Sequence, residues 1–410
     1  MERGKFSNVG IFDGNPKWEQ CIKRELQMYS RGADIRSEFS RDYNRILHCT
    51  AYRRLKHKTQ VFFATRNDHI CTRIEHVNHV AAVSYTIANF LGLNTELTTA
   101  IAIGHDLGHA PFGHAGEEIL RNMAQAELGG GFWHEQNSLR FIDSCETLQD
   151  PTGNEQNLNL TYAVRDGVIL HCGEVDENSI FPRDTVINLA DVTAVNQYAP
   201  FTWEGCIVKI ADKIAYLGRD IEDALLLNIL TAKQQEELKR LILISKESGC
   251  TDVWQINNTT LMHDFIIDLC SSSSPVWGIT FSPKHLAFLK ALKHFNNAYI
   301  YQHERLMSYK NYAQLIMETI FNVLKYRYCG SGTIRELKKY SESYPLLIKY
   351  FVEWLNKYSD QTNRREYSHL QNKVLYCIEN KQDYLSAIID FMSGMTDSFA
   401  IRVFDELTSF

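Results

Sequence analysis

The chain has 410 residues, of which 44% are hydrophobic and 22% are charged, and its formal net charge is −6. This length predicts two or three domains or one large domain, and the composition excludes collagen-like, disordered and low-complexity chains. The negative charge disfavours a dedicated nucleic-acid coat protein, although a local basic pocket can still hold an anion.

The N-terminus and the cysteines indicate a reducing compartment. No stretch approaches the ~18 consecutive apolar residues of a membrane span, and the first ten residues lack the apolar core of a secretory signal. The ten cysteines include no C-x-x-C pair, which argues against a disulfide framework or a thiolate metal site. We therefore expect a cytoplasmic protein with reduced cysteines and no membrane partner.

Helical periodicity dominates the chain, which predicts an all-α fold. In residues 72–91 apolar side chains recur at three- and four-residue spacing, and Gly92 ends the pattern. Asn94 is a candidate N-cap for a second helix, which should reach about Leu107 and stop at Gly108.

A third amphipathic pattern and several breaker clusters organise the rest of the chain. Residues 205–228 carry one apolar face, which predicts a core helix of about six turns. The Ser-rich stretch that begins at residue 271 is the candidate boundary between a larger helical part (1–270) and a C-terminal helical region (271–410) that packs on it. Loops are predicted at 129–131, 149–157, 172–185 and 271–283.

Histidines concentrate between His48 and His134, where nine of the fifteen lie. The central piece is G-H-D-L-G-H-A-P-F-G-H-A-G-E-E, in which His105 and Asp106 offer an imidazole nitrogen and a carboxylate oxygen to one divalent ion. His76 on the preceding helix and Asp212 on the 205–228 helix would complete a ligand set with room for water. The sequence therefore predicts a site for one divalent ion.

A second His–Asp dipeptide serves as an internal comparison. His263–Asp264 lacks the glycine-flanked, histidine-dense surroundings, so we interpret it as an ordinary pair on a helix surface. Taken alone, His105 would be interpreted as a hydrogen-bonded core histidine, and its surroundings reverse that interpretation.

The order His76, His105–Asp106, Asp212 resembles the H…HD…D metal motif of the HD-domain phosphohydrolases. The flanking blocks are more specific and are similar to those of the dGTPase-type deoxynucleoside triphosphate (dNTP) triphosphohydrolases. These blocks are RDYNRILHCTAYRRLKHKTQVF (41–62), the histidine-rich block (104–118), LNLTYAVRDG (158–167) and MTDSFA (395–400). The resemblance covers about residues 36 to 228 and the C-terminal block, and it leaves 229–380 unmatched.

The resemblance implies an HD-type catalytic domain over 1–270 with an N-terminal substrate-binding segment, one bound Mn²⁺, Mg²⁺, Fe²⁺ or Zn²⁺ ion, and a homo-oligomer. It implies hydrolysis of a dNTP between the 5′-oxygen and the α-phosphorus, which yields deoxynucleoside and triphosphate and contributes to dNTP pool control. A metal ion serves this reaction by polarising a phosphate oxygen and lowering the pKa of bound water.

The catalytic group that the resemblance implies comprises His114, Glu117 and His134, and either histidine could be the general acid. His109 lies four residues after His105, so the two can face one way in a helical segment. A helix-end residue that caps backbone carbonyls is the alternative interpretation of His109.

A triphosphate requires fixed cations. Residues 41–58 carry six lysines and arginines against one acid, and Arg53 belongs to this run. A solvated charged face is the alternative for Lys56 and Lys58. Arg73 and Lys213 occupy positions that contact phosphate in the family that the chain resembles.

Asp212, Tyr216 and Asp220 are spaced i, i+4, i+8, so they form one polar stripe on their helix. In a vertebrate member of the family, the residues matching Tyr216 and Asp220 meet the deoxyribose, and Gln60 matches a contact to the 3′-hydroxyl. The resemblance therefore implies discrimination against ribose. A plain helix-interface aromatic is the alternative for Tyr216.

Two other functions stay open at this point. One is another HD-superfamily phosphohydrolase, such as a phosphodiesterase or a guanosine tetraphosphate hydrolase. The other is a nucleotide-sensing or single-stranded nucleic-acid-binding protein with a vestigial site. The 41–62 block and the pair Tyr216 and Asp220 favour the dNTP hydrolase over the first alternative, and the complete ligand set and both acid/base candidates argue against the second.

Overall fold

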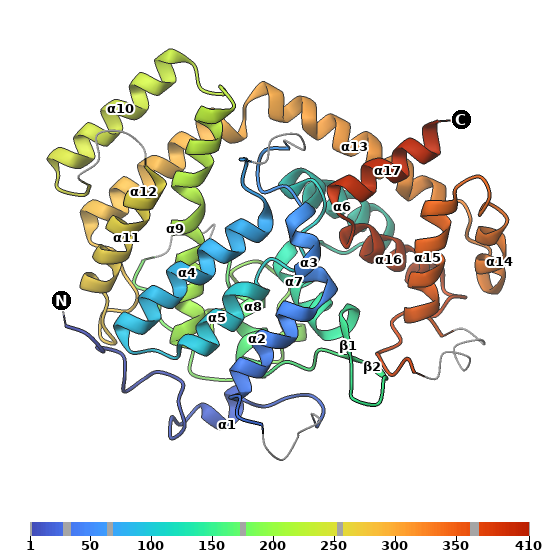
Figure 1. Ribbon diagram of the computed structural model, residues 1–410, viewed down its shortest axis with the longest axis horizontal. Helices are drawn as coiled ribbons and strands as arrows, with labels where there is room; N and C mark the ends of the chain where they lie inside the picture. Colours follow the sequence, from blue (N-terminus) through green and yellow to red (C-terminus); the bar gives the residue numbers. More distant parts are fainter. Residues whose placement is uncertain are drawn as a thin grey trace.

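The computed structural model describes residues 2–27, 34–63, 69–172, 178–251, 257–360 and 369–409. These residues form helices and one two-stranded antiparallel sheet (Figure 1), which confirms the predicted helical fold class. The helices up to the end of the 205–228 pattern are α1 (Trp18–Cys21), α2 (Glu38–His48), α3 (Thr50–Arg54), α4 (Arg73–Leu91), α5 (Thr95–Gly104), α6 (Gly113–Leu128), α7 (His134–Arg140), α8 (Tyr162–Ile169) and α9 (Trp203–Leu226).

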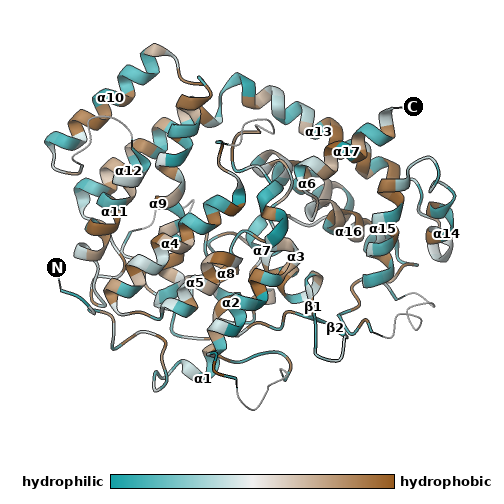
Figure 2. Ribbon diagram, in the orientation of Figure 1, coloured by the Kyte–Doolittle hydropathy of each residue, from teal (hydrophilic) through white to brown (hydrophobic). Residues whose placement is uncertain are grey.

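The remaining helices follow in the C-terminal half. They are α10 (Ala232–Glu247), α11 (Asn258–Ser272), α12 (Pro283–Asn296), α13 (Glu304–Lys325), α14 (Thr333–Lys338), α15 (Pro345–Tyr358), α16 (Lys381–Ser393) and α17 (Asp397–Thr408). Short 3₁₀ turns η1 (Leu55–His57), η3 (Leu189–Asp191) and η5 (Gly330–Gly332) and π-helical turns η2 (Phe141–Cys145) and η4 (Asn297–Tyr301) connect them. Hydrophobic and hydrophilic residues alternate along surface helices such as α10 and α13 (Figure 2).

The predicted helix ends follow local capping rules. Helix α4 ends where Gly92 adopts a left-handed conformation with φ 83°, as the sequence predicts. The side chain of Asn94 accepts hydrogen bonds from the backbone N–H groups of Glu96 and Leu97, which confirms it as the N-cap of α5.

The predicted end of α5 near Leu107 is wrong, because the helix stops at Gly104. The following turn is held by α7 instead: Ser138 Oγ accepts from Gly108 N at 2.9 Å and donates to His105 O at 2.7 Å. A Cβ at Gly108 would lie 2.1 Å from Ser138 N. Gly108 therefore allows the close approach of α7 rather than ending the helix.

Two hydrophobic cores lie under these helices. The first holds α2, α4, α5, α8 and α9 together with α11 and α12, and α9 packs against both α4 and α12 (Figure 1). The second is built by α6, α13, α15, α16 and α17. The proposed division of the chain at residues 270 and 271 stays a prediction.

The predicted loop at 149–157 is wrong in part. Strands β1 (Thr147–Gln149) and β2 (Glu155–Asn157) pair antiparallel, with Thr147 opposite Asn157. The turn between them is closed by Asp150, whose carboxylate accepts from the backbone N–H groups of Thr152 and Asn154. Such aspartate turns favour tight antiparallel pairing.

Further predictions concern the C-terminal half and the loops. Helix α11 extends two residues into the predicted 271–283 loop, and His263 is exposed on that helix as predicted. Part of the predicted 172–185 loop, residues 173–177, lies outside the described residues. Within the described ranges, no helix combines the length and the hydropathy that a bilayer crossing takes.

Candidate active site

The four predicted metal ligands converge from three elements. His76 comes from α4, His105 and Asp106 from the turn after α5, and Asp212 from the middle of α9. His76 Nε2 lies 3.0 Å from Asp212 Oδ1, and His105 Nε2 lies 3.5 Å from Asp106 Oδ1 and 4.0 Å from Asp212 Oδ1. Two imidazoles and two carboxylates are a donor set that fits Mn²⁺, Fe²⁺ or Zn²⁺.

The ligands are held by further contacts. His105 Nδ1 pairs with the Ala102 carbonyl at 2.6 Å, which turns Nε2 toward the carboxylates. Arg73 donates to Asp106 Oδ2 at 2.6 Å, and both side chains are buried. The set is thus oriented by the protein itself.

Both carboxylates are ionised at neutral pH. Burial alone would raise the pKa of Asp106, but the charges of His105 and Arg73 outweigh burial and hold the pKa well below its ordinary value. Burial is outweighed at Asp212 as well, where the hydrogen bond and charge of His76 lower the pKa to about 2. A cation is therefore favoured between them.

A second group lies beside the ligand set. Glu117 on α6 accepts from the backbone N–H of His134 at 3.2 Å, and its other oxygen lies 3.1 Å from His134 Nδ1. His114 Nδ1 lies farther from Glu117, at 3.8 Å, and the His114 side chain is exposed. Burial would lower the pKa of His134, but the carboxylates of Glu135 and Glu117 outweigh it and raise the pKa to about 10. His134 and Glu117 thus form an ion pair.

His109 stacks on this ion pair. Its ring centroid lies 4.5 Å from that of His134, with 22° between the planes. Nδ1 of His109 is buried and has no hydrogen-bond partner within the described residues, so this nitrogen caps no backbone carbonyl there. Burial and the charge of Arg73 lower the pKa of His109 well below its ordinary value, which keeps the ring neutral.

A cavity of about 450 Å³ joins the two groups. Its wall includes polar residues from the C-terminal half that the sequence analysis missed: Lys293, Asn297 and Tyr301. Their i, i+4, i+8 spacing is the same signal that singled out Asp212, Tyr216 and Asp220. The full lining is Gln60, Val61, Arg73, His76, Asp106, His109, His114, His134, Glu135, Asp212, Tyr216, Asp220, Lys293, Asn297 and Tyr301.

His171 is a further residue that the sequence analysis missed. It follows α8, it is buried, and its ring centroid lies 4.8 Å from that of His105 and 5.6 Å from that of His134. Burial and the charge of His105 lower its pKa to about 4. A lone histidine after an apolar helix gives no sequence signal of this position.

Comparison with known proteins places the chain among its relatives. The HD domain family matches residues 73–217, the stretch that carries all four candidate ligands. Deoxyguanosinetriphosphate triphosphohydrolase-like proteins of Bartonella quintana and Bartonella tribocorum are 31% and 33% identical to the chain. These alignments cover 97% and 98% of this chain and 94% and 96% of the relatives. A protein of the same name from Caldanaerobacter subterraneus is 30% identical over 91% of this chain and 86% of its own length.

The chain belongs to the deoxyguanosinetriphosphate triphosphohydrolase-like family. The recognition made from its sequence blocks is thereby confirmed. The HD-domain core, with its cluster of histidine and aspartate side chains, is the feature that this family assignment and the geometry share.

The structure does not bring every predicted site residue of this family member to the cavity. Arg53 is exposed on α3 and does not line the cavity, and buried Lys213 does not line it either. His105 and Glu117 also lie outside the lining.

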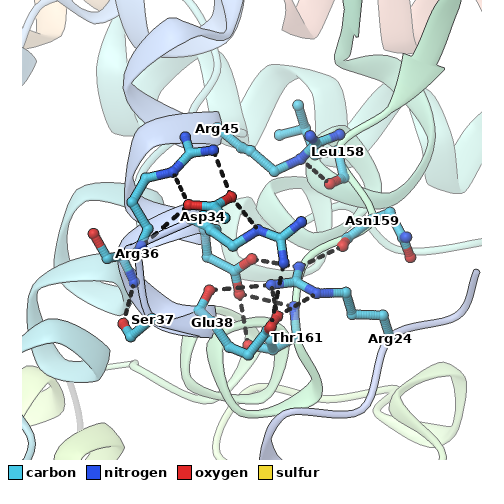
Figure 3. A network of polar contacts seen from close by, with 12 residues as sticks. Arg24, Asp34, Arg36, Ser37, Glu38, Arg45, Leu158, Asn159 and Thr161 are labelled. Carbon is cyan, nitrogen blue, oxygen red and sulfur yellow. Dashed lines mark hydrogen bonds and ion pairs between the residues drawn. The ribbon is translucent and has the colours of Figure 1, made fainter. Parts of the chain in front are cut away.

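Part of the basic run from 41 to 58 is structural. Arg45 donates to the carbonyl oxygen of Leu158 at 2.6 Å, next to Arg24, which donates to the Asn159 carbonyl at 2.7 Å (Figure 3). Buried Asp42 accepts from Thr161 N at 2.8 Å. Two of the sequence blocks are therefore joined here, away from the cavity.

Lys56 and Lys58, the last two basic residues of this run, differ in their surroundings. Lys56 is exposed, in agreement with a solvated face. Lys58 is buried, and its ammonium group donates to the carbonyl oxygens of His109 and, at 3.0 Å, Ser393, so a solvated face is wrong for this residue.

The C-terminal block supports the cavity wall. Buried Asp397, the first residue of α17, accepts from Thr59 N at 2.9 Å, from Thr59 Oγ1, and from Phe112 N at 2.8 Å. Thr59 precedes Gln60, and Phe112 precedes Gly113, where a Cβ would lie 3.0 Å from Gln60 O. Asp397 therefore fixes the two backbone segments that present Gln60.

Replacing Asp397 by Ala should destabilise the protein and loosen this wall. The buried N–H of Phe112 and the half-buried N–H of Thr59 lose their acceptor, and the loss of a buried acceptor costs about 1–3 kcal/mol. We expect a fall in Tm and a higher KM for the substrate. Asp405→Ala, at an exposed position on the same helix, is the matched control, and equal melting curves for the two variants would contradict the assignment.

Proposed function

We propose that the protein hydrolyses dNTPs to deoxynucleoside and triphosphate with the help of one divalent ion. The observation that carries the proposal is the cavity of about 450 Å³ that three of the four candidate ligands (His76, Asp106 and Asp212), His134 and the polar stripe of α9 all line. The family relationship supports the same reaction class.

The ion would be held by His76, His105, Asp106 and Asp212, where it supplies Lewis-acid polarisation of a phosphate oxygen and a bound water of lowered pKa. His134 gives a proton to the departing 5′-oxygen, and Glu117 holds the His134 imidazolium and its orientation. The short contact of 3.1 Å and the shielding of His134 favour it over exposed His114 as the general acid. His109 stacks on His134, and both His109 and His114 line the cavity in which the phosphates would lie.

Basic side chains from both halves of the chain would bind the triphosphate. Arg73 lines the cavity while it holds Asp106, so one side chain can bind a phosphate oxygen and orient a metal ligand. Lys293 lines the cavity from α12. We place the phosphate contacts at these two residues rather than at Arg53, and Lys213 stays a proposed contributor through its position beside Asp212.

The deoxyribose would lie against Tyr216, Asp220 and Gln60. The Oε1 atom of Gln60 is buried without a hydrogen-bond partner in the described part of the chain, as expected for an acceptor that awaits a hydroxyl. Tyr301 donates to Asp220 Oδ2 at 2.6 Å, and burial raises the pKa of Asp220 to about 7. A carboxyl group poised near neutrality can donate to or accept from a sugar hydroxyl.

The function is tested by incubating the purified protein with each of the four dNTPs and GTP in Mn²⁺ or Mg²⁺ and separating the products by chromatography. Free triphosphate together with deoxynucleoside is the expected result. Diphosphate or monophosphate products would indicate another HD-superfamily reaction. A protein that retains no divalent ion and converts no dNTP would indicate a nucleotide-binding role instead.

The proposal also predicts discrimination between deoxyribose and ribose. Replacing Tyr216 by Ala should admit ribonucleotides and lower overall efficiency, because the ring fills the space beside C2′ and packs on the sugar. A 2′,3′-dideoxynucleotide should be a poor substrate of the wild type, since Gln60 and Asp220 would be left unpaired. The measurement is kcat/KM for dGTP, GTP and dideoxy-GTP, or for the corresponding forms of whichever base is turned over. Equal wild-type turnover of the deoxy and ribo forms would rule out the deoxyribose-specific site.

A further inference from the structure

His171 is a buried histidine that none of the sequence motifs includes, and its ring lies against that of the candidate metal ligand His105. It is 1% exposed and follows the last turn of α8. Its Nδ1 pairs with the Val168 carbonyl at 2.6 Å, and among the described residues this is the one hydrogen bond of the ring. The Nε2 atom is therefore left to interact with the neighbouring group that contains His105 and Asp106.

The orientation of His171 repeats that of His105. In both residues Nδ1 pairs at 2.6 Å with the carbonyl oxygen three positions earlier in the chain, Ala102 for one and Val168 for the other. A backbone carbonyl on one ring nitrogen is the usual way in which a metal-binding histidine fixes its tautomer and presents the other nitrogen. The two rings stand edge to face, 4.8 Å apart at 78°.

Among the described residues, two triads of potential ligand atoms share His105, and a further triad joins His171 to His134 and Glu135. His76, His105 and Asp212 form one, and His105, Asp106 and His171 form the other, with all atoms of each triad within 4.8 Å of one another. His171 thus offers a ligand atom within 4.8 Å of those of both His105 and Asp106.

A purely structural histidine of this chain looks different. The ring of His285 is buried with both nitrogens in use, Nδ1 with Asp268 at 2.9 Å and Nε2 with the Cys250 carbonyl at 3.0 Å. His285 has no nitrogen left for a ligand, whereas His171 keeps one that faces ionised carboxylates.

We propose that His171 is a fifth protein ligand of the divalent ion, an inference that rests on the metal site of the proposed function. Five protein donors and one exchangeable position suit a six-coordinate ion such as Mn²⁺ or Fe²⁺ better than Zn²⁺, which prefers four ligands.

The test measures the binding of Mn²⁺ alone to the full chain, stripped with a chelator, by titration calorimetry. His171→Ala removes the ring, and His171→Asn keeps an amide donor for the Val168 carbonyl while removing Nε2. Loss of an outer-shell partner costs about 10–100-fold in metal affinity, so we expect the Kd of both variants to rise more than about 100-fold. His285→Ala, the control for a lost buried imidazole, should bind Mn²⁺ as the wild type does.

A smaller rise in the Kd of His171→Asn, or an unchanged visible spectrum of its Co²⁺-loaded form, overturns the fifth-ligand assignment. If the wild type binds Mn²⁺ and both His171 variants bind it equally well, this inference fails alone. If the wild type binds no divalent ion, the proposed function fails together with it.

Discussion

Replacing His105 or Asp106 by Ala should remove both the bound ion and the turnover of dNTPs. In the proposed site these two residues would supply a nitrogen and an oxygen to the same ion, and the pKa of Asp106 is held well below its ordinary value, which favours the charged carboxylate. Asp106→Ala also leaves Arg73 as a buried unpaired charge, a change that typically costs about 3–5 kcal/mol. Metal content by atomic absorption and triphosphate release are the measurements.

The control for this experiment lies within the chain. His263→Ala changes the other His–Asp dipeptide, whose histidine is exposed on α11, and it should alter neither metal content nor rate. Asp106→Asn keeps the size of the side chain and separates the loss of charge from the loss of packing. If His263→Ala removes the metal while His105→Ala retains it, the ion binds at His263–Asp264 and the proposed site is wrong.

Local rules explain what the sequence could predict. The left-handed Gly92 and the Asn94 cap depend on residues within a few positions of each other, so spacing alone locates the ends of α4 and the start of α5. The stripe of Asp212, Tyr216 and Asp220 is equally local, because one helix fixes its geometry. All three of these residues line the cavity.

Contacts between distant segments explain what the sequence could not predict. The end of α5 depends on Ser138 of α7, and the placement of Gln60 depends on Asp397 near the other end of the chain. Lys293 of α12 and Tyr301 of η4 reach the cavity because both elements pack on α9. Arg53 shows the opposite error, since charge density in the sequence does not tell an inward side chain from an exposed one.

Replacing His134 by Ala should lower kcat by about 10²–10⁴-fold, the usual contribution of a general acid or base, while the bound ion stays. The hydrogen bonds of His134 go to Glu117 and not to the predicted ligands, so we expect it to serve the leaving group rather than the ion. His114→Ala should cost less, because that side chain is exposed and lies farther from Glu117. Full loss of metal in His134→Ala would move this residue into the ligand shell.

The pH dependence of Glu117→Gln tests how the acid is kept protonated. The pKa of His134 is raised to about 10 against the effect of burial, and the carboxylate of Glu117 is one of the two charges that raise it. A general acid works in its protonated form, so kcat/KM of the wild type should fall only as pH rises toward that value. Removing the Glu117 charge lowers the pKa of His134 and should move this alkaline limb to lower pH. Glu118→Gln, at the exposed neighbouring position that pairs with Lys310, should leave the limb in place, and a limb that Glu117→Gln fails to move would exclude His134 as the acid.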